Sequence, residues 1–209
     1  MFAPICFAKA APAEAETLGR DIFIIGGQSN AVGYGIAPSL FYPYQSKVHN
    51  YANSGEWLPA SDPIDNGTNQ VDMVSHDAAP GRSFAIAFGS KLYELRPSYE
   101  VGVVPCAKSG RSLADYAPNL SRSTMYGSMV ARALEAASAG TLRGLIFYQG
   151  ENEAGQATSA NANAWAATFL NIYDNLCTDL GMPDLKCIVT ELHDLATPNN
   201  RPWWANVQA

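Results

Sequence analysis

The chain alternates short runs of apolar residues with longer segments whose apolar residues recur at helical spacing. The short runs are rich in β-branched and aromatic residues and mostly lack the alternation of a half-exposed strand, which is typical of strands buried in a parallel sheet. They predict five strands, at Asp21 to Gly26, Lys47 to Tyr51, Glu100 to Cys106, Leu142 to Gln149 and Lys186 to Leu192.

Three longer segments predict amphipathic helices, because their apolar residues return to one face every three or four positions. These segments are residues 83–95, 125–139 and 160–180, and each is followed by a helix-stopping Pro or Gly. The expected buried faces are Phe84, Phe88, Leu92 and Leu95, then Met129, Val130, Ala133, Leu134 and Ala137, then Trp165, Phe169, Ile172, Tyr173, Leu176 and Leu180.

This order of strands and helices predicts an α/β fold, a three-layer α/β/α sandwich around a parallel sheet. With 209 residues and 47% hydrophobic content, the chain can fill one such domain but not two comfortable ones. Residues 34–80 are rich in Gly, Pro, Asn and Asp apart from one short strand. Loops of this kind commonly shape a binding site, so we expect that role here.

The charge and hydropathy of the chain indicate which classes of partner to expect. The formal net charge is −6 and the Lys and Arg residues form no large cluster, so we expect no nucleic-acid partner. The sequence contains no apolar run of membrane-spanning length, so we expect no membrane partner. Composition does not predict the oligomeric state.

The first 20 residues predict a leader rather than part of the domain, which we place at residues 21–209. A short apolar stretch at Met1 to Ala8 leads to Ala13-Glu14-Ala15, which resembles the cleavage end of a secretion signal, although no positive segment precedes it. The leader is therefore either a clipped signal peptide or a disordered segment. The first alternative predicts a secreted or periplasmic protein, in which Cys177 and Cys187 would bridge.

Candidate chemistry gathers where three predicted strands end, and in a parallel sheet those ends share one edge. Ser29 directly follows the first strand, so one residue supplies a hydroxyl nucleophile and a backbone N–H for an oxyanion. Gly110 adds an N–H with no Cβ in the way, and Gln149 adds a neutral amide donor. Together the three predict an oxyanion hole, although a lone G-x-S after a strand is more often a turn serine.

Other functional patterns are weaker. The chain has neither G-x-G-x-x-G nor G-x-x-x-x-G-K-[ST] spacing, so no phosphate-binding loop is predicted. His49 falls on a short strand and His76 in a polar loop, while His193 follows a strand end and is the only histidine expected near the site. A structural role is the better expectation for His193. Glu151 and Glu153 are solvated carboxylates unless the strand end carries chemistry.

Several motifs resemble, in order, those of the SGNH hydrolases, in the branch of sialate O-acetylesterases and family 6 carbohydrate esterases (acetylxylan esterases). The first is Ile24-Ile25-Gly26-Gly27-Gln28-Ser29-Asn30, the nucleophile block. Further segments are similar to that branch's W-x-P-A…D-P, G-P-G-x-S-F-A, V-P-C-A-x-G-G-T-S, W-Y-Q-G-E-S and W-x-x-V-R-x-A-Q motifs, and they lie at residues 57–63, 80–85, 104–112, 147–152 and 203–208.

The resemblance implies a flavodoxin-like fold and a serine carbohydrate esterase that removes O-acetyl groups from xylan or sialic acid. By the same resemblance Ser29 is the nucleophile, and Gly110 and Gln149 complete the oxyanion hole. Glu151 matches a glutamate that orders the site or serves as the acid partner of the catalytic histidine. The family uses no metal and no organic cofactor, so we expect none.

One departure concerns the base. The family's catalytic histidine lies in a D-x-x-H motif, and this chain contains none, because Ser46, Met73 and Thr190 stand three residues before its histidines. We expect the C-terminal portion of the domain to be missing from this chain. Two rival functions stay open: a carbohydrate-binding protein that keeps the fold without turnover, and a lipase or thioesterase on the same scaffold.

Overall fold

The computed structural model describes residues 19–35, 41–65, 74–75, 77, 80–192 and 201–208. The predicted leader lies almost wholly outside this part of the chain, and the first strand begins at Arg20. Six strands form one sheet, in the order β3-β2-β4-β1-β5-β6. Their bounds are β1 Arg20–Gly27, β2 Val48–Tyr51, β3 Trp57–Pro59, β4 Glu100–Ala107, β5 Gly140–Tyr148 and β6 Lys186–Val189.

Five of these strands are parallel and match the five predicted from the apolar runs. The exception to an all-parallel sheet is β3, which pairs antiparallel with β2 through Tyr51 and Trp57. The connection between these two strands is a tight turn in which the Gly55 N–H donates to the Ala52 carbonyl at 2.9 Å. A connection this short permits only antiparallel pairing, whereas a parallel crossover needs a dozen residues or more.

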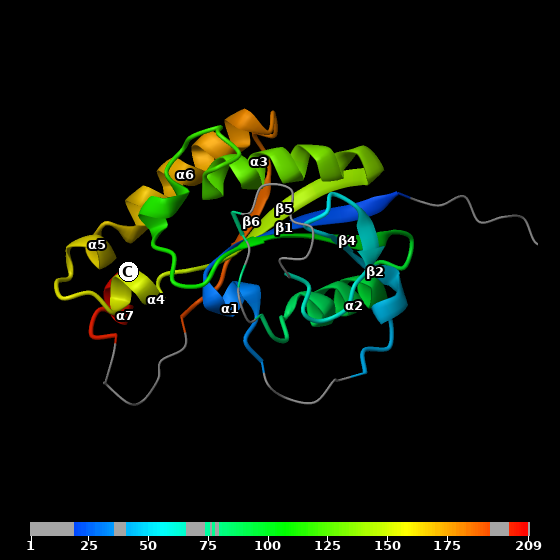
Figure 1. Cartoon of the computed structure of the whole chain (residues 1–209), viewed down its shortest axis with the longest axis horizontal. Coiled ribbons are helices and arrows are strands. Elements are labelled where there is room, and N and C mark those ends of the chain that lie inside the picture. The colour runs from blue at the N-terminus through cyan, green and yellow to red at the C-terminus, as the bar shows by residue number, and fades with distance from the viewer. Residues whose placement is uncertain are drawn as a thin grey trace, which may run out of the picture.

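Helices cover both faces of the sheet, which confirms the expected three layers (Figure 1). One face carries α1 and α2, and the other carries α3 and α6, with the shorter helices near the ends of the strands. Their bounds are α1 Ser29–Val32, α2 Ala85–Leu95, α3 Met125–Ala136, α4 Glu151–Ala154, α5 Ala160–Asn163, α6 Trp165–Asp179 and α7 Trp204–Val207, with 3₁₀ turns η1 Gln45–Lys47, η2 Leu113–Tyr116 and η3 Ala137–Ala139.

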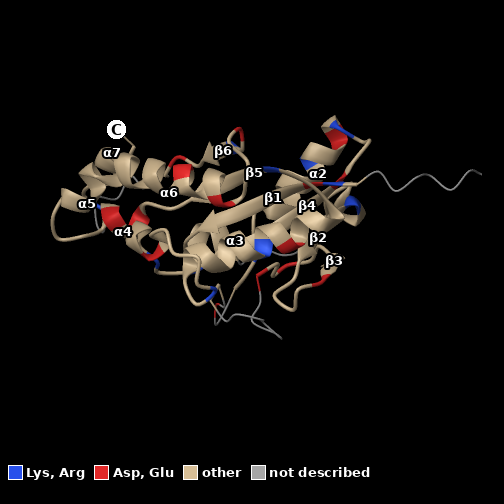
Figure 2. Ribbon diagram, turned by 90° about the horizontal axis from the view of Figure 1, so that it is seen from above, with Lys and Arg blue, Asp and Glu red and all other residues tan. Residues whose placement is uncertain are grey.

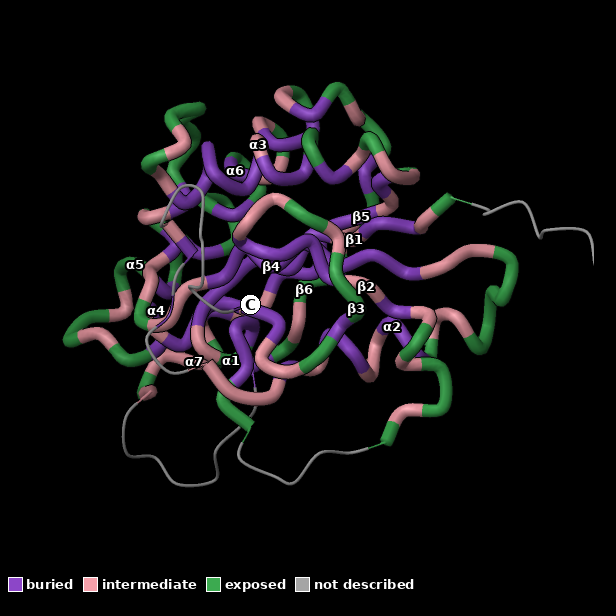
Figure 3. Tube along the Cα trace, turned by 45° about the vertical axis from the view of Figure 1, so that its right-hand side comes forward, coloured by how far each residue is buried: buried purple, intermediate pink, exposed green. Residues whose placement is uncertain are grey.

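The two faces hold separate apolar cores. Ile25, Val103 and Ile146 point to the α1–α2 face, while Ile24, Val104 and Phe147 point to the α3–α6 face. Neighbouring residues of one strand therefore serve opposite layers, as the pleat of a sheet requires. Buried residues follow the central strands in Figure 3. Continuous burial on both faces explains why these strands show no apolar–polar alternation.

The predicted buried face of α2 is correct in part, since Phe84 and Phe88 pack against the core while Leu95 does not. Its fully buried residues are Ala85, Ile86, Gly89 and Ser90, and the side chain of Leu95 is 68% exposed. A Cβ added at Gly89 would lie 2.6 Å from Cγ1 of Val48, so the helix approaches the sheet through its small residues. Phe88 is partly buried and packs its ring edge-on against Phe23.

Two other boundaries differ from prediction. The single helix expected over 160–180 is two helices, α5 and α6, separated at Ala164. The break places Trp165 with its indole N–H 2.7 Å from Oε1 of Gln149. Strand β6 ends at Val189, because its pairing with β5 stops at Phe147, and residues 190–192 instead border a cavity described below.

Candidate active site

The carboxyl ends of three adjacent strands bring together the residues that the sequence singled out. Ser29 follows β1, Gly110 follows β4 and Glu151 follows β5, and β1 lies between the other two strands. From β1 the chain continues to β2 on one side, and from β5 it continues to β6 on the other. Such a divergence of connections opens a crevice at the carboxyl edge, where ligands bind in open α/β sheets.

Ser29 is the first residue of α1 and is half-buried. The end of β1 is held in place by the Gln28 N–H, which donates to the Tyr148 carbonyl at 3.0 Å. Among the described residues, none hydrogen-bonds to the Ser29 hydroxyl or to its backbone N–H. Both groups are therefore free to meet a ligand at this edge.

Gly110 lies in the turn after β4 with φ +71°, a conformation that side chains rarely adopt. Its N–H has no partner in the described part of the chain. The turn is fixed on two sides, because Asp77 accepts from the Ser109 N–H at 2.9 Å and Asn152 donates to the Gly110 carbonyl at 3.3 Å. Gly110 is thus an exposed donor on a supported turn.

Gln149 differs from a ready oxyanion donor, because its side-chain amide is buried and already hydrogen-bonded within the protein. It is 1% exposed, and its amide nitrogen lies 2.5 Å from Oε2 of Glu153, 3.3 Å from the Arg111 carbonyl and 3.4 Å from Oε1 of Gln28. Its oxygen accepts from Trp165. Both amide hydrogens already face protein acceptors, so its role as an oxyanion donor stays a prediction and requires exchange of one acceptor for substrate.

Glu151 is 7% exposed and accepts a hydrogen bond from Asn30 at 2.5 Å through Oε1. Its Oε2 is buried and has no partner among the described residues. Burial raises the pKa of Glu151, and the Asn30 contact opposes that rise. In the ribbon of Figure 2, α4 is coloured red where its acidic residues lie. Glu151 is therefore a buried carboxylate beside Ser29's neighbour, not a solvated one.

Sequence reasoning missed two polar residues that tie the strand ends together, Gln28 and Asn152, and gave no contacts for a third, Glu153. Gln28 is 4% exposed and its Oε1 accepts from the Asn152 N–H at 3.2 Å. Glu153 is 3% exposed and its Oε1 accepts from the Leu113 N–H at 2.6 Å, while its Oε2 binds Gln149. The only sequence signal was the spacing of four between Gln149 and Glu153 on a strand end that runs into a helix.

The described histidine is remote from Ser29. His49 lies on β2 with Nδ1 3.6 Å from Oε2 of Glu100, the first residue of β4 and thus at the opposite end of the sheet. Burial and the nearby Arg20 lower the pKa of His49. His76 and His193 lie outside the described residues. Within the described ranges, no three His, Cys, Asp or Glu residues gather as metal ligands.

Cys177 and Cys187 are free thiols in the structure, so the bridge expected for an exported protein is not present in it. Burial raises the pKa of Cys187 to about 12. The thiolate, which is the form that oxidises, is therefore disfavoured.

Of the described helices, none has the length and apolar character needed to cross a bilayer.

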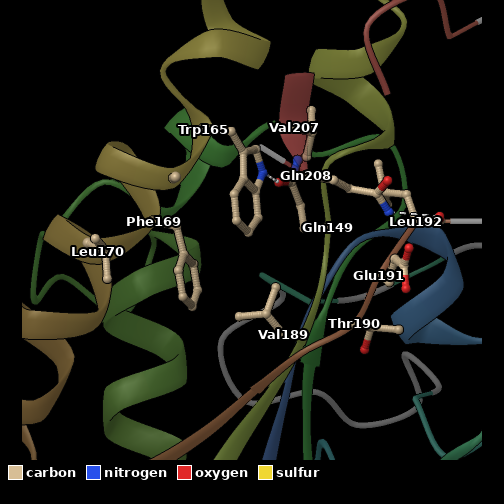
Figure 4. Close-up of a pocket in the computed structure, with 11 residues that line it drawn as sticks. Gln149, Trp165, Phe169, Leu170, Val189, Thr190, Glu191, Leu192, Val207 and Gln208 are labelled. Atoms are coloured by element: carbon tan, nitrogen blue, oxygen red, sulfur yellow. Dashed lines mark hydrogen bonds between the residues drawn. The ribbon is translucent and has the colours of Figure 1, made fainter. Parts of the chain in front are cut away.

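A cavity of about 550 Å³ opens beside Gln149 at the carboxyl ends of β5 and β6. In Figure 4 the rings of Trp165 and Phe169 border it from α6, and the residues after β6 border it from the other side. Val189 at the end of β6 is 44% exposed. The lining is mainly apolar, and its polar members are Gln149, Thr190, Glu191 and Gln208.

Comparison with known proteins defines the class. Residues 19–209 match a family of carbohydrate esterases described as sialic acid-specific acetylesterases, and the chain belongs to this family.

Solved structures share the fold. A protein from Arabidopsis thaliana aligns with a TM-score of 0.75 at 22% identity, over 91% of this chain and 79% of that one. NanS gives 0.64 at 16% identity, over 90% and 72%. A carbohydrate acetylesterase from Xanthomonas citri gives 0.57 at 16% identity, over 90% and 45%. At these identities the likeness supports the α/β fold alone.

Proposed function

We propose that this chain is a serine carbohydrate esterase that removes O-acetyl groups from sugars through an acyl-enzyme on Ser29. The observation that carries the proposal is the position of Ser29 between the Gly110 turn and Glu151, with a hydroxyl and an N–H to which none of the described residues hydrogen-bonds. Sialic acid esters are the first substrates to consider because of the family, and acetylated xylan is the second because of the motif resemblance. Export of the protein remains a prediction from its first residues.

The geometry supports an acyl-transfer sequence. The Ser29 oxygen attacks the acetyl carbon while a base takes its proton, and the carbonyl oxygen becomes an oxyanion facing the N–H groups of Ser29 and Gly110. The sugar oxygen then leaves with a proton, and an acetyl ester remains on Ser29. Water attacks that ester, releasing acetate and restoring the hydroxyl. No metal or cofactor is needed for any of these steps.

Glu151 is placed to organise the site rather than to attack. Its carboxylate holds Asn30, the residue after the nucleophile, and its second oxygen is buried and unpartnered among the described residues. A buried carboxylate of this kind orients and stabilises a protonated base that approaches it. We therefore assign Glu151 the role of acid partner to the base.

The test is acetate release from O-acetylated sialic acid and from acetylated xylo-oligosaccharides, with Ser29→Ala as the variant. We expect Ser29→Ala to lower kcat by about 10³-fold or more with the fold intact. Ser138→Ala is a matched control, because its hydroxyl donates to the Glu135 carbonyl at 2.8 Å just before β5 begins, at the far end of the sheet. Near-normal acetate release by Ser29→Ala would refute the assignment.

A second function is favoured by one observation. His49, the histidine within the described ranges, lies beside Glu100 at the opposite end of the sheet from Ser29, which is the arrangement expected of a protein that binds acetylated sugars without turnover. Binding of the two acetylated sugars by calorimetry, combined with no acetate release from either, would identify this alternative. Preference for long acyl chains over acetyl would instead indicate a lipase or thioesterase.

A further inference from the structure

The strand that leads to Ser29 ends at Gly27, which has no side chain to restrict its backbone. Gly27 has φ +129°, and a Cβ there would lie 2.0 Å from the Tyr148 carbonyl oxygen, so only glycine fits. Glycine is also the residue with the widest choice of backbone conformations. The orientation of the Gly27 peptide, two residues before the nucleophile, must therefore be set by contacts from elsewhere in the fold.

Backbone groups supply two of those contacts, because the Gly27 carbonyl accepts from the Lys108 N–H at 3.1 Å and the Gln28 N–H donates to the Tyr148 carbonyl at 3.0 Å. One side chain supplies the others. Tyr116, the last residue of η2, is 0% exposed, and its hydroxyl oxygen lies 2.7 Å from the Gly27 carbonyl oxygen and 3.1 Å from the Gly27 nitrogen. It also lies 3.1 Å from the Cys106 carbonyl oxygen. The hydroxyl can thus accept from the Gly27 N–H while it donates to one of the two carbonyls.

The position of this hydroxyl in the sheet is specific. Gly27 is paired with Ala107 in the parallel β1–β4 register, so the Gly27 N–H faces the Cys106 carbonyl. Tyr116 therefore contacts both groups of this pair, one step before the Lys108 N–H donates to the Gly27 carbonyl at 3.1 Å. One strand leads to Ser29 and the other to Gly110, the residues whose N–H groups face the proposed oxyanion. A single hydroxyl thus links the two donor segments.

The tyrosine is itself held firmly. η2 begins with a capping box in which Ser112 and Asp115 exchange hydrogen bonds, and the Asp115 carboxylate lies 2.7 Å from the Ser112 nitrogen. The Tyr116 ring packs edge-on against Phe147 of β5, with centroids 5.3 Å apart. Burial raises the pKa of Tyr116 above its ordinary value, so the hydroxyl keeps its proton throughout the neutral range. Rigid support of this kind is what precise donor placement requires.

We propose that Tyr116 is a positioning residue for Ser29: its hydroxyl fixes the Gly27 peptide and, through it, the direction of the Ser29 N–H and hydroxyl. This inference rests on the proposed acyl-transfer function. Without the hydroxyl, only the backbone bonds to Lys108 and Tyr148 hold the end of β1, so the strand end shifts and the Ser29 N–H points away from the oxyanion. The oxyanion forms only in the transition state, so the defect falls on kcat rather than on KM.

The experiment compares Tyr116→Phe with Tyr126→Phe. Tyr126 is also 0% exposed, and its hydroxyl donates to Asp179 at 2.5 Å, between α3 and α6 and away from the strand ends. Both variants lose one buried hydroxyl, so both are expected to lower the thermal midpoint. Only Tyr116→Phe is expected to lower kcat on p-nitrophenyl acetate, by about 10- to 100-fold with KM changed less than about twofold, because one misplaced oxyanion donor costs at most about 10³-fold. Equal kcat in the two variants, measured per folded molecule, would overturn the inference.

A second measurement separates this inference from the function itself. If the wild-type chain releases no acetate, the proposed function fails, and amide NMR then decides the role of Tyr116. We expect Tyr116→Phe to shift the Gln28 and Ser29 amide resonances and to speed exchange of the Gly27 N–H more than Tyr126→Phe does. Unchanged resonances would overturn the inference. If Tyr116→Phe does not fold, Tyr116→Trp replaces it: the indole cannot accept from Gly27, so a wild-type Ser29 resonance would again overturn it.

Discussion

Gln149 illustrates, at the level of single residues, how a candidate catalytic group also serves as a structural hub. Its amide meets Glu153, Arg111 and Gln28, and its oxygen meets Trp165. These contacts hold the ends of β1, β4 and β5 at fixed separations. A buried amide with every group paired is stabilising, and removing it leaves several buried partners unsatisfied.

Gln149→Ala tests whether this amide also stabilises the oxyanion. If it does, we expect a loss of about 3 kcal/mol in transition-state stabilisation, which appears in kcat more than in KM. Trp165→Phe is the control, since it removes the contact to the Gln149 oxygen and leaves the amide nitrogen in place. Steady-state kinetics on an acetyl ester provide the measurement. A change in KM alone would make Gln149 a substrate-binding residue, and a kcat equal to that of Trp165→Phe would make it purely structural.

Part of this site could be predicted from the sequence, and there is a physical reason why the rest could not. Ser29, Gly110 and Glu151 follow three strands directly, so the convergence of parallel strand ends was enough to place them together. The roles of Gln28, Asn152 and Glu153 depend on which buried polar groups meet across three loops. Such pairings are set by tertiary packing, and no local pattern in the sequence encodes them.

At the level of elements, the buried strands were predictable because each is a continuous apolar run. Helix α2 was less so, because its fully buried face consists of Ile86 and the small residues Ala85, Gly89 and Ser90. Helical periodicity identifies the large residues and gives little weight to small ones. Leu95, which the pattern placed inside, is 68% exposed.

Gly89→Ala measures how closely α2 approaches the sheet. Alanine in a helix interior ordinarily stabilises by about 0.5–1 kcal/mol relative to glycine. Here the new Cβ would lie 2.6 Å and 2.9 Å from the two methyl carbons of Val48. We therefore expect a net destabilisation of about 1–3 kcal/mol in urea unfolding, the usual cost of overpacking a core.

The matched variant for this prediction is the double substitution Gly89→Ala with Val48→Ala. Removing the Val48 methyl groups vacates the space that the new Cβ needs, so the double variant should be more stable than the sum of the two single losses. Additive losses would show that the helix shifts away from the sheet instead of clashing with it. A stabilised Gly89→Ala single variant would contradict the close approach itself.

At the level of the whole molecule, the candidate site residues and the described histidine lie at opposite edges of the sheet. Ser29, Gly110 and Glu151 lie at the carboxyl edge of the sheet, and His49 lies beside Glu100 at the amino edge. The remaining histidines, His76 and His193, lie outside the described residues, and the sequence contains no D-x-x-H. Within the described ranges, no histidine is therefore placed to act as the base for Ser29.

If neither His76 nor His193 serves Ser29 as a base, the protein should hydrolyse p-nitrophenyl acetate slowly. A serine hydroxyl without a general base is a poor nucleophile at neutral pH, and the oxyanion donors alone give about 10³- to 10⁴-fold over water. His49→Ala should leave this rate unchanged, because His49 is at the wrong end of the sheet.

The rate should also rise steadily with pH, since hydroxide rather than a side chain removes the proton. A plateau above pH 7 would instead report a histidine base with a pKa of about 6.5. Fast turnover with such a plateau, abolished by His193→Ala and kept in His76→Ala, would show that His193 serves as the base.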